Sequence, residues 1–169
     1  RGIPVLNPMY QFYTALYHCF ISPYLFTDVD GRYRGIDQQI HSAENGPVYT
    51  VFSLWDTFRT YHPLMTIIDP ERNNAFIRTL LTNYDQGGIL PKWELAGNYT
   101  GTMIGYHAVP VIVDAYMKGN REFDVDKAYK AITESAHYRQ GKFLYPSDDV
   151  REMLDPKAKY YNDTLGFIP

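Results

Sequence analysis

The strongest constraint on the fold of this sequence is an alternation between two kinds of helical segment. Residues 9–21 and 103–118 are apolar on nearly all sides, whereas residues 69–88 and 126–138 carry a single apolar face. A helix of the first kind must be covered all round, and a helix of the second kind packs one face inward and leaves the other in water. Two helical layers satisfy both needs, so the chain is predicted to be mainly α, with helical hairpins that form inner and outer layers and with long irregular loops.

The segment that follows Asp69 predicts the clearest helix. Asp69 and Pro70 are residue types of a helix cap and first turn, and Gly87-Gly88 is typical of a helix end. The apolar face between them consists of Phe76, Ile77, Leu80, Leu81 and Tyr84. The face predicted for the helix at 126–138 consists of Val125, Ala128, Tyr129, Ile132 and Ala136.

Prolines and small polar residues set the other expected boundaries. Asn7-Pro8 predicts the start of the first buried helix, and Ser53 followed by Asp56 is close to a capping box at the start of another. Pro63 is expected to break or kink that second helix before Leu64, and Pro110 to kink the buried helix at 103–118.

Three segments read as irregular because Gly, Asp and Pro interrupt every apolar period: 24–49, where short strands are also expected, 89–101 and 140–169. A closed ring of six inner and outer helix pairs requires twelve helices, which at usual helix and loop lengths takes upwards of roughly 200 residues. The 169 residues of this chain supply about half of such a ring.

Composition excludes some classes of function. The 16 Lys and Arg against 19 Asp and Glu leave a net charge of -3 with no basic cluster, which argues against a nucleic-acid binder. No apolar run reaches the roughly 18 residues of a membrane span, and the start lacks the layout of a signal peptide. Cys19 is the single cysteine and gives no disulfide evidence. Aromatic residues, mostly tyrosine, make up 16% of the chain, which suits both a mixed core and a sugar-binding cleft.

The first candidate binding segment is 27–35, where two acidic and two basic residues lie among glycines. Loops that a rigid scaffold displays commonly carry binding groups. Asp28 and Asp30 can reach a sugar hydroxyl or a calcium ion, although the other ligands of an EF-hand are missing. The alternative is an Asp-Gly turn in which the carboxylates bond to backbone amides.

The second candidate segment contains Trp55, Asp56 and Arg59. Trp55 and Arg59 are four positions apart, so they share one helical face, and Asp56 lies three positions before Arg59. An aromatic platform beside an ion pair suits stacking under a sugar ring, with the carboxylate and the guanidinium on its hydroxyls. The alternative is that Asp56 caps the first turn beside a core tryptophan.

The third candidate is Glu94, which follows Trp93 in a loop flanked by glycine. A carboxyl beside an apolar ring can have a raised pKa, which a general acid requires at neutral pH. The five histidines show no H-x-x-x-H spacing, so a zinc site is rejected. His107, at the start of a buried helix, is expected to be a satisfied core residue rather than a base.

Several strings together resemble the calcium-dependent exo-α-mannosidases of glycoside hydrolase family 92. They are FYTALYH at 12–18, DVDGRYRG at 28–35, YTVFSLWDTFR at 49–59, the Gly pair at 87–88, WELAGN at 93–98, IGYH at 104–107 and DAY at 114–116. The likeness covers most of the chain in order, and these strings are long enough to be specific.

This resemblance implies a catalytic (α/α)6 barrel that works with a preceding β-sandwich domain, and residues 1–169 would form about half of that barrel. It implies a secreted, periplasmic or cell-surface enzyme that processes N-glycans and other mannose-containing glycans. The reaction would be inverting hydrolysis of a terminal α-mannoside, commonly α-1,2-linked, with Ca2+ coordinating the sugar hydroxyls.

Inverting hydrolysis needs one carboxylic acid and one carboxylate base, about 6.5–9.5 Å apart. The family motifs of the Glu-Gly-Asn and Gly-Asn-Asp-Asp types that carry this pair are absent here. The resemblance therefore assigns this chain to the sugar-binding half of the site, with Glu94 as the local candidate for the acid. The residues expected to bind substrate are Asp30, Arg34, Trp55, Asp56, Arg59 and Glu94, with Asp28 and Arg34 in supporting positions.

Two readings remain open from the sequence. In one, the chain is a piece of an α-mannosidase that is inactive by itself, and exposed inner helix faces should make it associate. In the other, it is a non-catalytic helical module that binds a glycan or serves as a scaffold, and it should stay monomeric.

Overall fold

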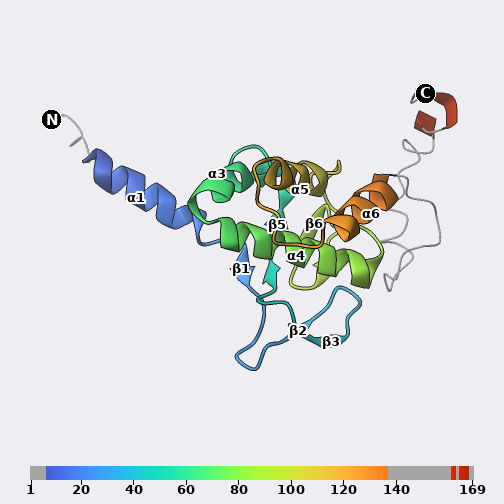
Figure 1. Cartoon of the computed structure of the whole chain (residues 1–169), viewed down its shortest axis with the longest axis horizontal. Coiled ribbons are helices and arrows are strands. Elements are labelled where there is room, and N and C mark those ends of the chain that lie inside the picture. The colour runs from blue at the N-terminus through green and yellow to red at the C-terminus, as the bar shows by residue number, and fades with distance from the viewer. Residues whose placement is uncertain (1–6, 137–160, 163, 168–169) are drawn as a thin grey trace.

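The computed structural model describes residues 7–136, 161–162 and 164–167, and this part of the chain is mainly helical (Figure 1). The helices are α1 (Pro8–Cys19), α2 (Leu54–Thr57), α3 (Tyr61–Ile68), α4 (Pro70–Gly87), α5 (Ala108–Met117) and α6 (Val125–Ala136). The strands are β1 (Tyr24–Leu25), β2 (Arg32–Arg34), β3 (Ile40–Ser42), β4 (Tyr49–Thr50), β5 (Phe52–Ser53), β6 (Trp93–Leu95) and β7 (Asn98–Tyr99).

The central helix α4 confirms the sequence prediction at both ends and along its face. The Asp69 carboxylate accepts a hydrogen bond from the backbone N–H of Arg72 at 3.1 Å, with Pro70 in the first turn. Gly88 ends the helix in the left-handed region (φ 81°), and its N–H donates to the Tyr84 carbonyl at 2.7 Å. All five residues predicted for the apolar face are buried.

Helices α3, α5 and α6 each pack against α4 and form the core with it. Phe76 of α4 lies at the centre, where it meets the rings of Tyr49 and Phe52 edge-on at centroid distances of 4.8 and 5.8 Å. His62 of α3 meets the same ring edge-on at 5.8 Å. Because a buried aromatic ring contributes a large apolar area, Phe76 joins α3 and α4 to the short strands β4 and β5.

His62 is a polar group inside this apolar core, with only 1% of its surface exposed. Burial lowers the pKa of His62 to about 4, although the neighbouring Asn73 side chain partly opposes the shift. The ring is therefore neutral at pH 7, and acid conditions must place a charge in the core or unfold it.

The predicted effects of two prolines on helices are wrong. The helical path breaks earlier, between the end of α2 at Thr57 and the start of α3 at Tyr61. Pro63 lies in the first turn of α3, and Pro110 in the first turn of α5, which begins at Ala108 rather than at residue 103. A first-turn residue has no intrahelical acceptor for its N–H, so proline costs little there.

Helices α5 and α6 each bury one face, and both differ from the sequence prediction. α5 was expected to be covered all round, but its buried residues are Ala108, Val111, Ile112 and Ala115, while Val113, Tyr116 and Met117 are exposed. The buried residues of α6 are Ala128, Ala131 and Ser135. Tyr129, predicted for that face, is 73% exposed. Small residues let α6 approach α4 closely, which rotates the buried face away from the larger side chains.

The strands form three small antiparallel sheets, β1 with β4, β2 with β3, and β5-β6-β7. The short strands expected within 24–49 are therefore confirmed, whereas the segment 89–101, predicted to be irregular, contains the hairpin β6–β7. Its two turn residues, Ala96 and Gly97, both have positive φ (49° and 69°), as a two-residue hairpin turn requires.

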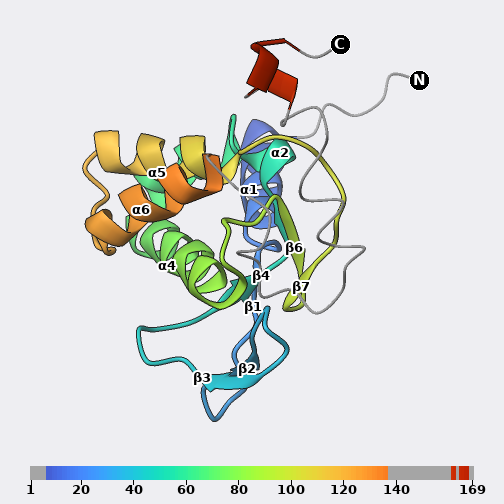
Figure 2. The ribbon, with the colours of Figure 1, turned by 90° about the vertical axis from the view of Figure 1, so that its right-hand side faces the viewer.

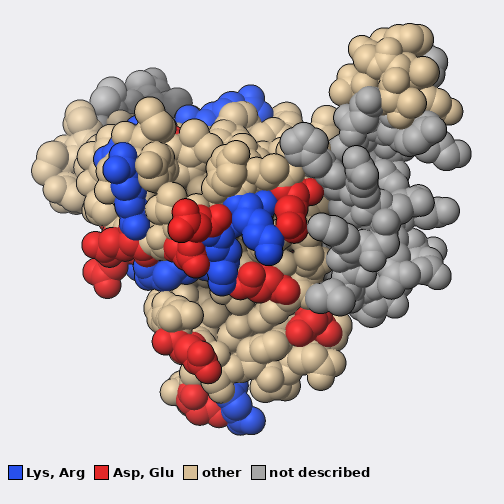
Figure 3. All heavy atoms as spheres, turned by 45° about the vertical axis from the view of Figure 1, so that its right-hand side comes forward, with Lys and Arg blue, Asp and Glu red and all other residues tan. Residues whose placement is uncertain are grey.

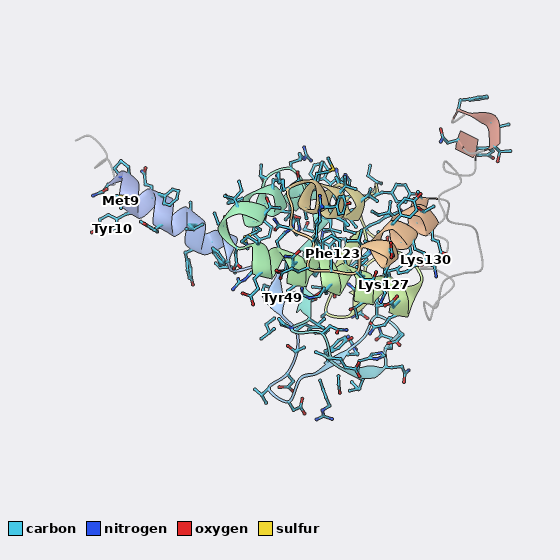
Figure 4. All side chains as sticks on the ribbon, in the orientation of Figure 1. Met9, Tyr10, Tyr49, Phe123, Lys127 and Lys130 are labelled. Atoms are coloured by element: carbon cyan, nitrogen blue, oxygen red, sulfur yellow. The ribbon has the colours of Figure 1, made fainter. Side chains whose placement is uncertain are left out.

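Helix α1 has the predicted position but not the predicted burial. It projects from the body of the molecule, and none of its residues is buried (Figure 1). Figure 4 shows Met9 and Tyr10 far from the side chains labelled on the body. The exposed large apolar residues of this helix are Met9, Tyr10, Phe12, Tyr13 and Tyr17. An apolar pattern predicts that a helix packs against other elements, but it does not show which ones. Within the described residues no element buries α1.

Within the described residues, no helix combines the length and the apolar character needed to cross a membrane. The irregular segment predicted for 140–169 lies mostly outside the described residues, and 161–162 and 164–165 within it are helical.

The exposed aromatic surface of α1 predicts self-association of this chain. Replacing Tyr10 and Tyr17, which are seven positions apart on one helical face, with lysine should convert associated chain to monomer because it removes apolar contact area. Size-exclusion chromatography with light scattering measures the change against the monomer mass of 19.6 kDa. Tyr129→Lys on α6, an equally exposed tyrosine, is the matched control and should leave the association unchanged. A wild-type chain that is monomeric at all concentrations would contradict this prediction.

The buried His62 predicts acid destabilisation over a defined pH range. The pKa of His62 in the folded chain lies below its value in the unfolded chain. The stability that the neutral His62 ring contributes is therefore complete above pH 6.5 and is lost as the pH falls to 4. The free energy of unfolding should fall by about 3 kcal/mol over this range from His62 alone. Urea unfolding at a series of pH values measures this slope, which His62→Leu should remove. The exposed His18→Gln serves as the control and should retain the wild-type slope.

Candidate functional site

The first part of the candidate site is the α2 cluster, which consists of Trp55, Asp56 and Arg59. The strand β5 leads directly into α2, and Ser53 of β5 pairs with Trp93 of β6. Leu54 is fully buried and anchors the first residue of α2 in the core. The side chains of Trp55 and Asp56 in this short helix, and of Arg59 two residues past its end, are all exposed to solvent.

The expected aromatic platform is present in the α2 cluster. The guanidinium of Arg59 lies over the Trp55 ring, 4.6 Å from its centroid, and 5.1 Å from the Phe58 centroid. The ring of His107 lies 4.7 Å from that of Phe58, which extends the row of flat groups from α2 to the start of α5.

Asp56 is placed differently from the expected ion pair. Its carboxylate accepts a hydrogen bond from the Ser53 hydroxyl, and within the described residues it forms no ion pair with Arg59. The expected capping box is therefore not formed, because Ser53 donates its hydroxyl to the Asp56 carboxylate and does not accept from a backbone amide of α2. A carboxylate and a guanidinium that are not paired to each other both keep bonding capacity for a ligand.

His107, predicted to be a satisfied core residue, is half-buried, and its Nδ1 atom has no hydrogen-bond partner within the described residues.

Two further residues, Lys92 and Tyr106, were missed as site candidates. Lys92 Nζ lies 5.8 Å from the centroid of the exposed Tyr106 ring, and burial lowers the pKa of Lys92. A cation directly before Trp93 was the available signal for Lys92, and the IGYH string contained Tyr106 and His107.

Glu94 is buried in the middle strand of the β5-β6-β7 sheet, with 2% of its surface exposed. Its Oε1 accepts hydrogen bonds from the Gly97 N–H and the Thr50 hydroxyl, both at 2.8 Å. Its Oε2 accepts from the Val51 N–H at 3.1 Å. The Thr50 oxygen also accepts from the Ala96 N–H at 2.6 Å, so the network connects two chain segments.

The Glu94 network holds a strained residue. Val51 separates β4 from β5 and has a φ of 70°, a left-handed conformation that is an outlier for a β-branched residue. Its N–H is directed to the Glu94 carboxyl. Burial raises the pKa of Glu94, and the bonds from Gly97, Thr50 and Val51 act in the opposite direction. Glu94 can therefore fix the bend that leads into α2, and both of its oxygens already have protein donors.

The Asp28–Asp30 segment forms the turn that was the alternative to a binding loop. The Asp28 carboxylate accepts from the Val29 N–H at 2.7 Å, and its carbonyl accepts from the Gly31 N–H at 2.9 Å. Asp30 accepts hydrogen bonds from the backbone N–H and the guanidinium of Arg32 at 3.0 and 2.6 Å, and these bonds lower the pKa of the exposed Asp30 carboxyl. The carboxylates of both residues are used locally.

Arg34 connects the β2–β3 ribbon to the β6–β7 hairpin, because its Nη2 donates to the Ala96 carbonyl at 2.9 Å. A Cβ at Gly97 would lie 2.5 Å from the Arg34 carbonyl oxygen, so only glycine permits this close approach. The structure thus brings Arg34 and Glu94 to one hairpin. It separates the β2–β3 ribbon from the α2 cluster: in Figure 2 the ribbon lies at the bottom of the molecule and α2 lies in its upper part.

No group of three or more His, Cys, Asp or Glu side chains in the described residues is placed to hold a metal ion. Calcium takes six to eight oxygen ligands, and Asp28 and Asp30 are bonded within their own turn. The described residues therefore do not fit a calcium site by themselves. Figure 3 shows Lys and Arg interspersed with Asp and Glu across one face, without a large area of a single sign.

Comparisons with known proteins were consistent with one another. The model of the glycosyl hydrolase family 92 catalytic domain matches residues 7–169. No curated protein matches the chain. The fold is similar to the family GH92 α-mannosidase BT3965 from Bacteroides thetaiotaomicron, with a TM-score of 0.74 and 42% identity over 76% of this chain and 18% of that chain.

Two further solved structures give the same result. The complex of the same enzyme with mannoimidazole has a TM-score of 0.72 and 43% identity over 74% of this chain and 17% of that one. The family GH92 inverting mannosidase BT2199 from Bacteroides thetaiotaomicron VPI-5482 has a TM-score of 0.72 and 30% identity over 94% of this chain and 20% of that one. The chain spans about a fifth of the length of these relatives. It belongs to glycosyl hydrolase family 92, as a part of the catalytic domain.

Proposed function

We propose that this chain is the sugar-binding part of an α-mannosidase that hydrolyses terminal α-linked mannose, commonly α-1,2-linked, with inversion. One relative is described as an inverting mannosidase, and another is described in complex with mannoimidazole. The observation that carries the proposal is the α2 cluster, in which Arg59 stacks on an exposed Trp55 beside an exposed Asp56. A flat apolar ring next to charged hydrogen-bonding groups suits one face and the hydroxyls of a sugar.

The rest of the catalytic machinery lies elsewhere in a longer protein. The chain supplies helices of an (α/α)6 barrel, about half of it, that works with a β-sandwich domain. The uncovered α1 and the fifth of the relatives' length support this arrangement. Calcium, if the enzyme follows its family, is bound by oxygen ligands outside the described residues. A secreted, periplasmic or cell-surface location and a role in N-glycan processing remain part of the same proposal.

Glu94 acts in this proposal as a structural carboxyl and not as the general acid. A general acid must reach the leaving oxygen of the sugar, and its partner carboxylate must lie about 6.5–9.5 Å away. Glu94 is buried, both its oxygens accept bonds from protein donors, and it holds Val51 at the entry to α2. The acid and the base are therefore placed in the parts of the enzyme that this chain lacks.

The α2 cluster predicts mannoside binding that depends on Trp55. Trp55→Ala should weaken the binding of a mannoside inhibitor such as mannoimidazole at least tenfold, because stacking on an aromatic ring and the Arg59 geometry are both lost. Isothermal titration calorimetry on the chain measures the change in Kd. Tyr129→Ala, which removes an exposed aromatic ring on α6, is the matched control and should bind as the wild type does.

Activity separates the proposal from its alternatives. The chain alone should not hydrolyse a chromogenic α-mannoside, with Ca2+ or with EDTA, because the acid and base pair is outside it. Turnover that EDTA abolishes would place that pair within this chain. Binding that Trp55→Ala leaves unchanged would remove the α2 cluster from the sugar site, and a monomeric, folded chain that binds glycans without turnover would favour the non-catalytic module.

The Glu94 network predicts a pH-dependent stability difference. Glu94→Gln should lower the free energy of unfolding by about 1–3 kcal/mol, because an amide N–H then faces the N–H of Val51 or Gly97. The folded pKa of Glu94 is raised above 4.5, so its protonation stabilises the wild type below that pH, and this contribution is lost as the pH rises through the folded pKa. Denaturant unfolding should therefore show the gap between wild type and variant shrinking as the pH rises. A constant gap would contradict the raised pKa.

A further inference from the structure

A cavity of about 500 Å3 lies between α4 and the strand-and-loop segment that precedes β4. One wall is the side of α4 that carries Arg78 and Gln86, and the opposite wall is the loop 42–48 with Glu44. Tyr33 of β2 and His41 of β3 close it from the ribbon side. This volume falls within the usual range for small-molecule sites, and the wall groups are mostly polar.

Several polar groups converge at the ribbon end of the cavity. A Cβ at Gly35 would lie 2.6 Å from Asp37 Oδ1 and 2.7 Å from both Gln86 Oε1 and His41 Cδ2. His41 Nε2 lies 3.0 Å from both carboxylate oxygens of Asp37, which fixes the ring. Only a residue without a side chain at position 35 lets these three groups approach one another.

The same end of the cavity offers an unused donor. Gln86 Nε2 donates to the Tyr33 hydroxyl at 2.9 Å, and Gln86 Oε1 accepts from the Ile36 N–H at 3.2 Å. The Tyr33 oxygen is therefore an acceptor in the described contacts, and its own proton has no acceptor among the described residues. Tyr33 is 8% exposed, so a ligand hydroxyl in the cavity would provide the missing partner.

The loop and α4 offer groups of both signs. Within the described residues, the Glu44 carboxylate has no hydrogen bond or ion pair. Arg78 uses Nη1 on the Glu122 carbonyl at 2.6 Å and keeps its remaining N–H donors. Asp85, also in the lining, is already paired with Lys127 at 2.7 Å. The cavity therefore combines a free carboxylate, a partly free guanidinium and a phenol donor.

This donor set selects among ligand classes. Described residues provide no group of three acidic, His or Cys side chains that could hold a cation. The carboxylates of Asp37 and Glu44 oppose a phosphate or other anion, since only Arg78 offers a full positive charge. A neutral ligand with several hydroxyls, each able to donate and accept, matches carboxylate acceptors beside guanidinium and phenol donors.

The geometry points to a second carbohydrate site, in which this cavity binds one neutral sugar residue through Tyr33, Glu44 and Arg78. It is separate from the α2 cluster, because none of residues 55–59 lines the cavity, and Figure 2 shows the β2–β3 ribbon at the bottom of the molecule and α2 in its upper part. The inference goes beyond the proposed hydrolysis and does not depend on the α2 cluster binding sugar. Such a site would hold a glycan at a residue other than the one being cleaved.

Nuclear magnetic resonance titration of the full chain with methyl α-mannoside tests this inference. Saturable shifts are expected at the backbone amides of 42–46, 48 and 78–86. Glu44→Gln and Tyr33→Phe should each weaken this binding about tenfold, because the first replaces a charged acceptor oxygen with an NH2 donor and the second removes the phenol hydroxyl from the cavity. Glu71→Gln, which changes the same charge in the first turn of α4, is the matched control and should leave the affinity unchanged.

Each alternative outcome has a distinct reading. A folded chain, shown by cooperative thermal unfolding, that gives no saturable shift at these amides at millimolar sugar would overturn the inference. Shifts confined to 55–59 would support the α2 cluster as the sugar site and would reject the cavity. Shifts with inorganic phosphate but not with the sugar would make the cavity an anion site, which also overturns the inference. Cavity shifts without shifts at 55–59 would support the cavity while the proposed substrate site failed.

Discussion

The hydrogen bonds of the Glu94 carboxyl are the constraint on which the arrangement of the site depends. Three donors from two chain segments converge on this one buried side chain, and Thr50 connects them further to the Ala96 amide. The strands involved are two or three residues long, so their ladders alone are too short to fix a position. A buried carboxyl with all its donors in place supplies the missing rigidity, because releasing any one donor would leave a buried polar group unpaired.

The fixed bend at Val51 determines where the α2 cluster stands. From Val51 the chain enters β5, where Phe52 is buried against Phe76 of α4, and then α2, where Leu54 is buried. Because Phe52 and Leu54 are held in the core, the Trp55 side chain is directed toward solvent. The packing of these two neighbours therefore accounts for the exposure of Trp55. Its surface is then available to Arg59 and to a ligand.

Local chemistry in the sequence was enough to predict some parts of this structure. The caps of α4 and its buried face depend on residues within one helix, and the i, i+4 relation of Trp55 and Arg59 depends on a single turn. Burial of α1 could not be predicted in the same way, since burial depends on which elements lie alongside, and a fifth of a relative's length brings few of them. The effects of Pro63 and Pro110 on their helices were predicted wrongly because a proline costs little in the first turn of a helix, and the sequence does not show where that turn begins.

Non-local contacts account for the remaining differences in the site. The pattern beside Trp93 suggested an acid with a raised pKa, and the direction of the shift agrees because burial raises the pKa of Glu94, whereas donors such as the Val51 N–H, 43 positions away, oppose that shift. Nothing in the local sequence shows those donors, so Glu94 looked available for catalysis. The Asp28–Asp30 segment shows the opposite case. Its motif predicted two alternatives, a binding loop or a turn held by Asp-to-backbone bonds, and the structure contains the turn.

The β6–β7 hairpin links the two ends of the molecule through opposite sides of the same four-residue segment. Glu94, on its inner side, holds Val51 and therefore the α2 cluster. The turn at Ala96 and Gly97 receives Arg34 and Gln38 from the β2–β3 ribbon, at 2.9 and 2.7 Å. That ribbon carries Tyr33 and His41 into the wall of the cavity beside α4. A displacement of the hairpin would thus act on both the α2 cluster and the ribbon wall of the cavity, through the Glu94–Val51 bond on one side and the Arg34 and Gln38 bonds on the other.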